Sequence, residues 1–251
     1  MPVQTFLSQA RATLVPPRSA PYGPLPPMLL ALTLVTGLVD AFSYLALGRV
    51  FVANMTGNVV FMAFSLAGAS GFSVTASVLA LAAFAAGALA GGRLGHAMPG
   101  HRARLLLTGT VLQAALVAAA CVTGALVGLP ATGAPRGALI VLLGVAMGGQ
   151  NAVVRQLGVP DLTTTVLTMT ITGMAADSRL AGGASGKGAV RLLSALAMFL
   201  GALAGAALIG HGHTDVPLLC GVVLLAAVAA ALAPHRAATG GWTGGEISGR
   251  V

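Results

Sequence analysis

Residues 37–58 form a largely apolar stretch that contains a carboxylate, two amides and a hydroxyl able to do chemistry. Asp40 supplies a carboxylate, and Asn54, Thr56 and Asn58 supply two amides and a hydroxyl soon after it. A carboxylate next to amides can bind a cation, carry a proton or hold a polar solute. Lipid tails offer no hydrogen bonds, so in a membrane each of these groups needs a protein partner. We therefore interpret this stretch as the lining of a polar site inside a membrane protein.

Asp40 shares one predicted helix face with small and polar residues at spacings of three and four, namely Thr33, Thr36, Gly37, Ser43 and Tyr44. A charged Asp at the centre of a membrane helix costs about 2.5–3.5 kcal/mol, so this face should point into the bundle. Two interpretations of Asp40 stay open. It binds a proton, a cation or a substrate, or it fixes helix packing through capping hydrogen bonds or a buried ion pair. Arg49 and Arg155 are the candidate ion-pair partners.

Later apolar runs carry a second group of polar residues. Asn151 and Arg155 share a helix face, with Gln150 beside it, and Thr165 and Thr168 follow in the next run. Threonine hydroxyls can bond to carbonyls of their own helix, so a structural role for the threonines stays open. The predicted substrate or ion site comprises Asp40, Ser43, Asn54, Thr56, Asn58, Gln150, Asn151, Arg155, Thr165 and Thr168. Gly57 would permit local unwinding that frees backbone carbonyls for coordination.

The composition places these residues in a membrane. Of the 251 residues, 57% are hydrophobic and 7% charged, whereas a soluble domain carries about 25% charged residues. The predicted fold is all-α, a polytopic transmembrane helical bundle. The net charge of +8 indicates Lys and Arg in cytoplasmic loops. The cations are dispersed and there is one Trp, so we expect no binding to nucleic acid.

Eight apolar runs approach the length of about 20 residues that crosses a bilayer. They are 28–47, 50–69, 73–93, 104–128, 136–154, 160–177, 189–210 and 216–233. The second and sixth are short and polar, so either is a candidate broken or re-entrant helix. We therefore predict about 6–8 membrane helices in a single transmembrane domain, residues 28–233.

Both ends of the chain differ from this domain. Residues 1–27 are Pro-rich and lack the apolar core of a signal peptide, which predicts a flexible cytoplasmic tail. Residues 234–251 are Gly-rich and predicted to be disordered. With eight crossings, eight Lys and Arg residues lie on the side of the termini and five on the other. This favours a multi-pass protein of the cell membrane with both termini in the cytoplasm.

Segments of the first half recur in the second, which predicts two repeats of about 112 residues, spanning about 28–128 and 136–233. Gly87-Ala-Leu-Ala-Gly91 recurs as Gly201-Ala-Leu-Ala-Gly205, and Asp40-Ala41 parallels Asn151-Ala152. The segment 106–115 likewise resembles 218–227. Four crossings per half would make the repeats parallel, and an odd number would make them inverted. The glycines at 87, 91, 201 and 205 should let helices approach closely.

Other chemistry finds little support. Cys121 and Cys220 lie in apolar runs, and His211, His213 and Asp215 form too weak a cluster to predict a metal site. No hydrolase, metalloprotease or phosphate-loop motif is present. We therefore expect neither catalysis nor a cofactor or metal. The expected partners are the lipid bilayer and a small-molecule or ion substrate, and assembly into a homo-oligomer is left open.

One pattern resembles a known family. It reads Gly37-x-x-Asp40-Ala41-x-Ser43-x-Leu45-x-Leu47-Gly48-x-x-Phe51-x-x-Asn54-Met55-Thr56-Gly57-Asn58, with later segments Gly148-x-Gln150-Asn151-Ala152 and Thr164-Thr165-x-Leu167-Thr168. These are similar to the signature of the YoaK-like family of bacterial multi-pass membrane proteins, over most of residues 28–233. The family is a domain of unknown function, so the resemblance implies the membrane class and no substrate.

These observations favour a secondary transporter or channel for a small solute or ion, with its polar site where the two halves meet. The alternative is a membrane scaffold, sensor or accessory subunit that transports nothing, in which the polar residues satisfy one another. An intramembrane enzyme acting on lipid is a third hypothesis. It would need a nucleophile beside a base, and Asp40 is the one inward acid identified.

Overall fold

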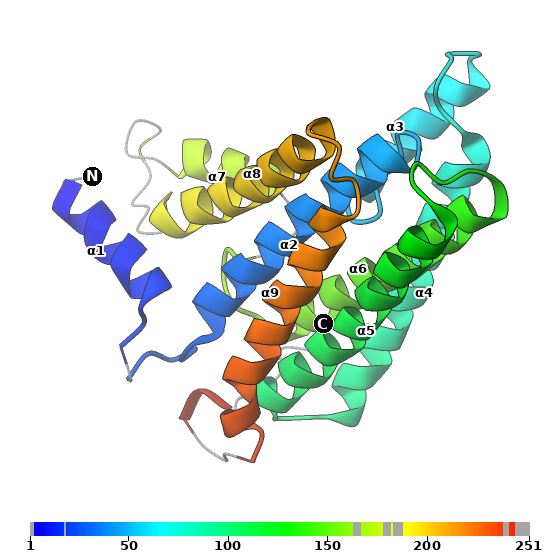
Figure 1. Cartoon of the computed structure of the whole chain (residues 1–251). Coiled ribbons are helices and arrows are strands. Elements are labelled where there is room, and N and C mark those ends of the chain that lie inside the picture. The colour runs from blue at the N-terminus through cyan, green and yellow to red at the C-terminus, as the bar shows by residue number, and fades with distance from the viewer. Residues whose placement is uncertain are drawn as a thin grey trace.

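The chain folds into helices joined by short connections (Figure 1). The computed structural model describes residues 3–17, 19–162, 167–177, 182, 188–237 and 241–243. Within these residues the α-helices are α1 (Val3–Leu14), α2 (Leu25–Ala46), α3 (Met55–Leu66), α4 (Val74–Ala97), α5 (Arg102–Val127), α6 (Gly133–Leu157), α7 (Leu167–Ala176), α8 (Gly188–Gly210) and α9 (Val216–Leu232). Two short 3-10 turns follow, η2 (Ala233–His235) and η3 (Gly241–Thr243).

Six of these helices are long and apolar enough to cross a membrane, namely α2, α4, α5, α6, α8 and α9. The predicted all-α membrane bundle is therefore confirmed. The second and sixth predicted runs instead form the short helices α3, with 12 residues, and α7, with 10. At about 1.5 Å per residue, neither spans the roughly 30 Å of hydrocarbon. The number of full crossings is thus at the lower end of the predicted range.

Two pairs of long helices pack through glycine. Leu34 of α2 presents its carbonyl at Gly201 of α8, where a Cβ would collide with it. Val145 of α6 presents its carbonyl to Gly87 of α4 in the same way. Gly91 also faces a backbone carbonyl, that of Gly149, and Gly205 faces the side chain of Ala41. Small residues allow such contact between helix backbones in a membrane.

The two glycine contacts are separated by similar distances along the chain. Val145 follows Leu34 by 111 residues, and Gly201 follows Gly87 by 114. Along each pair the contacts advance together, so α2 runs parallel to α8 and α4 runs parallel to α6. In Figure 1, α5 rises from the bottom of the view to the top, whereas α9 descends. α5 and α9 therefore run in opposite directions.

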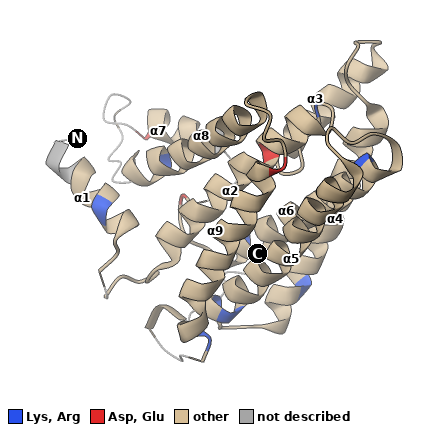
Figure 2. Ribbon diagram, in the orientation of Figure 1, with Lys and Arg blue, Asp and Glu red and all other residues tan. Residues whose placement is uncertain are grey.

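The polar face predicted for α2 does point inward. Thr33, Thr36, Asp40 and Ser43 are all at most 3% exposed. Large apolar side chains such as Leu126 and Phe199 lie exposed on the outside, as expected of a surface that faces lipid. Figure 2 shows that charged residues are sparse and lie mostly near helix ends. Burial of polar groups and exposure of apolar ones together match a membrane environment.

Both ends of the chain are more ordered than predicted. The predicted flexible tail contains α1, in which Phe6, Leu7, Ala10 and Leu14 recur at spacings of three and four. α1 packs against α8 and α2, although Leu7 and Leu14 are 60% and 50% exposed. In the predicted C-terminal tail, η3 brings Trp242 against His235, with 5.3 Å between the ring centroids. Residues 238–240 and 244–251 lie outside the described part of the chain.

Candidate functional site

Asp40 accepts hydrogen bonds from the non-helical segment between α2 and α3, residues 50–54. Its Oδ1 atom accepts from the backbone N–H groups of Val52, at 3.1 Å, and Ala53, at 3.0 Å. Its Oδ2 atom accepts from the side-chain amide of Asn54. Three donors therefore converge on one carboxylate that is 3% exposed. Asp40 holds the break between the two helices in place.

Asn58, on α3, supplies hydrogen-bond partners for the backbone of the same segment. Its Oδ1 accepts from the N–H of Phe51 at 2.9 Å, and its Nδ2 donates to the carbonyl of Phe51 at 2.6 Å. Backbone groups that leave a helix inside a bilayer need such partners. Asp40 and Asn58 thus explain how residues 50–54 can be non-helical within an apolar part of the chain.

This arrangement bears on the two interpretations of Asp40. A carboxylate has about four lone-pair sites, and three are occupied by protein donors. The contacts expected from the capping interpretation are therefore present, and binding of a proton, a cation or a substrate by Asp40 stays a prediction. The predicted ion pair with Arg49 or Arg155 is wrong: Arg49 lies over the ring of Phe72, 5.6 Å from its centroid, and Arg155 is exposed.

Gly57 has a different role from the one predicted. It lies within α3, and the break in the helix comes before it. A Cβ at this position would lie 2.7 Å from the ring of Phe51. That ring stacks on Tyr44, with 5.1 Å between centroids, and lies 5.6 Å from Phe61. Gly57 makes room for this aromatic cluster.

The structure does not gather the remaining predicted residues around Asp40. Thr56 and Thr168 are exposed, and Thr165 lies outside the described residues. Ser43 donates to the carbonyl of Asp40 in its own helix at 3.2 Å. Asn151 donates to the carbonyl of Met147 at 2.9 Å, again within its own helix. The expectation that Asp40 meets the second half of the chain is therefore not supported.

The polar contact between α2 and the second half of the chain occurs instead one helical turn before Asp40, at Thr36. Nε2 of Gln150, on α6, donates to the hydroxyl of Thr36, on α2, at 2.9 Å. Oε1 of Gln150 accepts from Nε2 of Gln113, on α5, at 2.5 Å. All three residues are at most 3% exposed. We call Thr36, Gln150 and Gln113 the central amide chain; it links helices from both halves at the core of the bundle.

A narrow void adjoins this chain between α2, α5 and α6. Its lining includes Leu32, Thr110, Gln113 and Gln150, and it is too small to admit a water molecule. The hydroxyl of Thr110 is 1% exposed and has no hydrogen-bond partner. Polar groups so deeply buried are rarely left unpaired. Sequence reasoning selected Gln150 but missed Gln113 and Thr110, although an amide in the middle of an apolar run was a usable indication.

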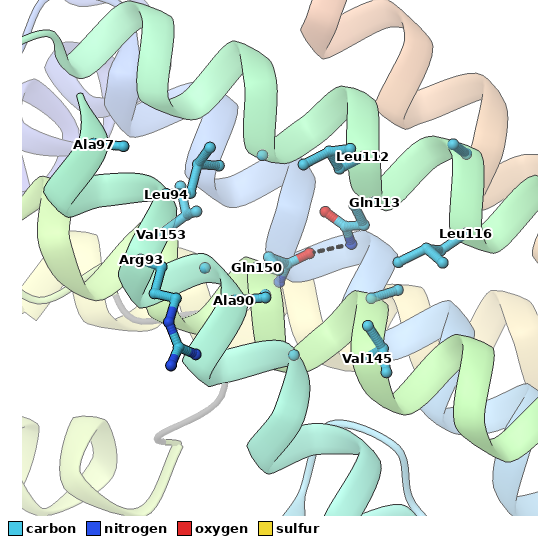
Figure 3. Close-up of a pocket in the computed structure, with 16 residues that line it drawn as sticks. Ala90, Arg93, Leu94, Ala97, Leu112, Gln113, Leu116, Val145, Gln150 and Val153 are labelled. Carbon is cyan, nitrogen blue, oxygen red and sulfur yellow. Dashed lines mark hydrogen bonds between the residues drawn. The ribbon is translucent and has the colours of Figure 1, made fainter.

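A cavity of about 580 Å³ opens on the other side of the two glutamines. It lies between α4 and α5 with α6 as its floor, and we call it the α4–α5 groove. Figure 3 shows Gln113 and Gln150 hydrogen-bonded beside it, and Arg93 toward the opposite end with its guanidinium directed away from them. Its other lining residues are apolar or glycine. The central amide chain therefore separates this groove from the inner void.

A cluster of charges joins the α6–α7 connection to α8. Arg191, near the start of α8, bonds through Nε to Asp161 at 2.8 Å and through a terminal nitrogen to Asp177 at 2.6 Å. The side chains of Arg191 and Asp161 are 12% and 15% exposed, and that of Asp177 is 53% exposed. Asp161 lies in a turn with a positive φ of 61°, which Asp tolerates.

Comparisons with known proteins agree with this architecture. The model of a family described as "Protein of unknown function (DUF1275)" matches residues 28–231. The chain is 32% identical over 151 residues to the UPF0700 transmembrane protein YoaK of Bacillus subtilis strain 168. That alignment covers 60% of this chain and 65% of the relative. No solved structure matches. The chain therefore belongs to the DUF1275 family, the YoaK-like membrane proteins of unknown function.

Proposed function

We propose that the protein is a secondary transporter of a small polar solute, built from two inverted repeats around the central amide chain. The observation that carries this proposal is the matched glycine packing of α2 with α8 and of α6 with α4. In transporters, inverted halves place the substrate site at their interface near the bilayer midplane. The proposal includes no catalytic step.

The packing geometry supports an inverted repeat. Each half contributes three long helices and one short one, in the order long, short, long, long. An odd number of crossings turns the second half over relative to the first. The contact of Gly37 with Met198 corresponds in the same way to that of Gly148 with Phe84, with offsets of 111 and 114 residues. Two such halves can exchange equivalent conformations, which is how inverted repeats produce alternating access.

The cations support an orientation with the termini in the cytoplasm. With six crossings, the connections on one face carry only Arg49 and Arg136 among the described residues. The described cations on the terminal face are Arg11, Arg93, Arg102, Arg104, Arg155, Arg191 and Arg236. The difference in the number of cations between the two faces is larger than with eight crossings, because α3 and α7 do not cross and the chain leaves each of them on the face where it entered. It follows the positive-inside rule for a multi-pass protein of the cell membrane.

Single-cysteine labelling tests the orientation. Cysteine is placed at His101, between α4 and α5, or at Thr132, before α6, in a chain with Cys121 and Cys220 changed to serine. With six crossings, a membrane-impermeant maleimide added to intact cells should label only position 132. Eight crossings with cytoplasmic termini would expose position 101 instead, and that result would contradict the proposal.

The central amide chain is the best-supported substrate site, and its chemistry is neutral. Thr36, Gln113 and Gln150 offer donors and acceptors without a formal charge, and Thr110 adds an unpaired hydroxyl. These groups suit an uncharged polar solute better than an ion. The adjoining void is too small for a water molecule, so it does not form an open channel past the central amide chain. Asp40 supports the site by fixing the helix break next to it.

The experiment starts from the purified protein in detergent. A panel of uncharged polyols, sugars, amides and neutral amino acids is screened for thermal stabilisation, and uptake of any stabilising compound is measured in proteoliposomes. Gln150→Leu should reduce both stabilisation and uptake about tenfold, equivalent to one lost hydrogen bond of about 1.4 kcal/mol. Gln156→Leu, on the same helix, is the matched control, because it removes a hydrogen bond from a side-chain amide to the carbonyl of Gly92, away from the centre of the bundle.

Two results would overturn the transporter proposal. One is that no compound stabilises the wild type and none accumulates in the proteoliposomes. The other is that Gln150→Leu and Gln156→Leu behave alike. A non-transporting scaffold or sensor is the second candidate, and one observation favours it: the polar groups of Asp40, Asn54 and Asn58 are satisfied within their own half.

A further inference from the structure

We propose that the α4–α5 groove binds one acyl chain of an anionic phospholipid from the leaflet on the side of the termini. The groove lies outside the central amide chain, so this inference does not depend on transport. It rests on the place of the groove within the bilayer, on its apolar wall and on the charge at one end.

The groove arises from how three helices pack. α4 and α5 are consecutive in the chain, yet each packs mainly on α6 and they hardly contact one another. Gly87 and Gly91 allow α4 to lie against the backbone of α6, with Val145 and Gly149 directly opposite. The close approach of α4 to α6 forms the floor, and the separation of α4 from α5 leaves the space above it open.

The dimensions match one acyl chain in one leaflet. On α4 the lining runs from Gly87 to Ala97, the last residue of the helix. At 1.5 Å per residue this is about 15 Å, half of the hydrocarbon thickness. On α5 the lining runs from Gly109 to Leu116, around the middle of the helix. The groove therefore reaches from one interface to the bilayer midplane.

The chemistry changes along that length. At the midplane end the amides of Gln113 and Gln150 bond to each other, and Gln150 also bonds to Thr36, so this end is polar but uncharged. Between the ends the wall is aliphatic. At the interface Arg93 lines the groove and is exposed, and the exposed Arg104 lies in the first turn of α5 at the same face. Basic pockets between helices on the cytoplasmic side suit anionic lipid headgroups.

The other half of the molecule provides an internal comparison. By the repeat correspondence, Ala207 of α8 stands where α4 has Arg93, and Leu225 of α9 stands where α5 has Gln113. The corresponding face between α8 and α9 therefore lacks the cation. Ala204 of α8 corresponds in the same way to Ala90, which lines the groove, and both alanines are exposed. This pair makes a matched set of positions for a test.

The test is native mass spectrometry of the full chain in detergent, titrated with phosphatidylglycerol or with phosphatidylcholine of the same acyl chains. The wild type should retain one phosphatidylglycerol about fivefold more tightly than phosphatidylcholine, as expected for one basic residue near the headgroup. Arg93→Gln should abolish that preference, whereas Arg236→Gln, exposed on the same face, should preserve it. Ala90→Phe should fill the groove and remove binding of both lipids, and Ala204→Phe should not.

Several outcomes would overturn the inference. They are equal retention of the two lipids by the wild type, unchanged binding by Ala90→Phe, and equal loss in Ala204→Phe. If the wild type is a dimer that Ala90→Phe dissociates, without specific lipid retention, then a second copy of the chain covers the groove. Should Ala90→Phe fail to fold, Ala115→Phe on α5 fills the same groove and replaces it. None of these measurements requires a transported solute.

Discussion

Replacing Asp40 by alanine should destabilise the protein more than any conservative change nearby. The substitution removes the acceptor for the N–H groups of Val52 and Ala53 and for the amide of Asn54. Water does not reach this buried site, so the two backbone donors lose their partners without replacement. Each unsatisfied buried donor costs about 1–3 kcal/mol, which gives a loss of about 2–6 kcal/mol.

Two further variants separate this effect from a general one. Asp40→Asn keeps the shape and one acceptor oxygen, so it should cost only about 1–2 kcal/mol, provided that Asn54 turns its own oxygen toward the new amide. Ser43→Ala is the matched control on the same face of α2. Its hydroxyl bonds to a carbonyl of its own helix, so the loss should stay below about 1 kcal/mol.

The assay combines unfolding of the purified protein by SDS in mixed micelles with hydrogen exchange of the amides at positions 52 and 53. Asp40→Ala should unfold at the lowest SDS fraction and exchange these amides fastest, with Asp40→Asn between it and Ser43→Ala. Equal stability and equal protection in Asp40→Ala and Ser43→Ala would refute the capping role. A stable Asp40→Asn variant that has lost uptake of a substrate accepted by the wild type would show that the carboxylate takes part in coupling.

Two other predictions follow from packing and charge. Gly201→Ala should cost about 1–3 kcal/mol of stability, because the added Cβ meets the α2 backbone. Gly221→Ala should be tolerated, since the nearest atoms to its Cβ are 3.8 and 3.9 Å away. Unfolding in SDS compares the two variants, and equal costs would contradict the contact at Gly201. Arg191→Gln should cost about 1–3 kcal/mol and speed proteolysis between α6 and α8, because it removes the charged partner that Asp161 and Asp177 share. Asp177→Asn, at an exposed site, should cost less than about 1 kcal/mol, and the reverse order would refute the assignment.

Much of the fold could be predicted from local properties of the chain. Long apolar runs with few charges predicted the membrane helices, because only a helix satisfies its own backbone in hydrocarbon. The short, polar second and sixth runs were recognised as candidates for broken segments, and α3 and α7 are indeed too short to cross. The two tails were less predictable. Their order comes from contacts with distant residues, as when Trp242 packs on His235 and fills the space beside Gly23.

The polar residues of the candidate site were only partly predictable. Spacing placed Asp40 on an inward face, and burial of that face is confirmed. Spacing could not say whether its partner was an arginine, a solute or a backbone, because all three satisfy a carboxylate. Gln113 escaped notice because a single amide in an apolar run has no periodic pattern. Its importance appears only when α5 packs on α6 and brings it to Gln150.

The sequence alone determined that the protein lies in a membrane, that it is all-helical and that its polar side chains point inward. All three depend on the free-energy cost of placing each residue in hydrocarbon. Tertiary structure decided which groups meet. It paired Asp40 with a backbone segment 12–14 residues away, and it joined Thr36 to Gln150 across 114 positions. Such partners depend on how whole helices are packed, and the glycine contacts that fix this packing bring together residues far apart in the chain.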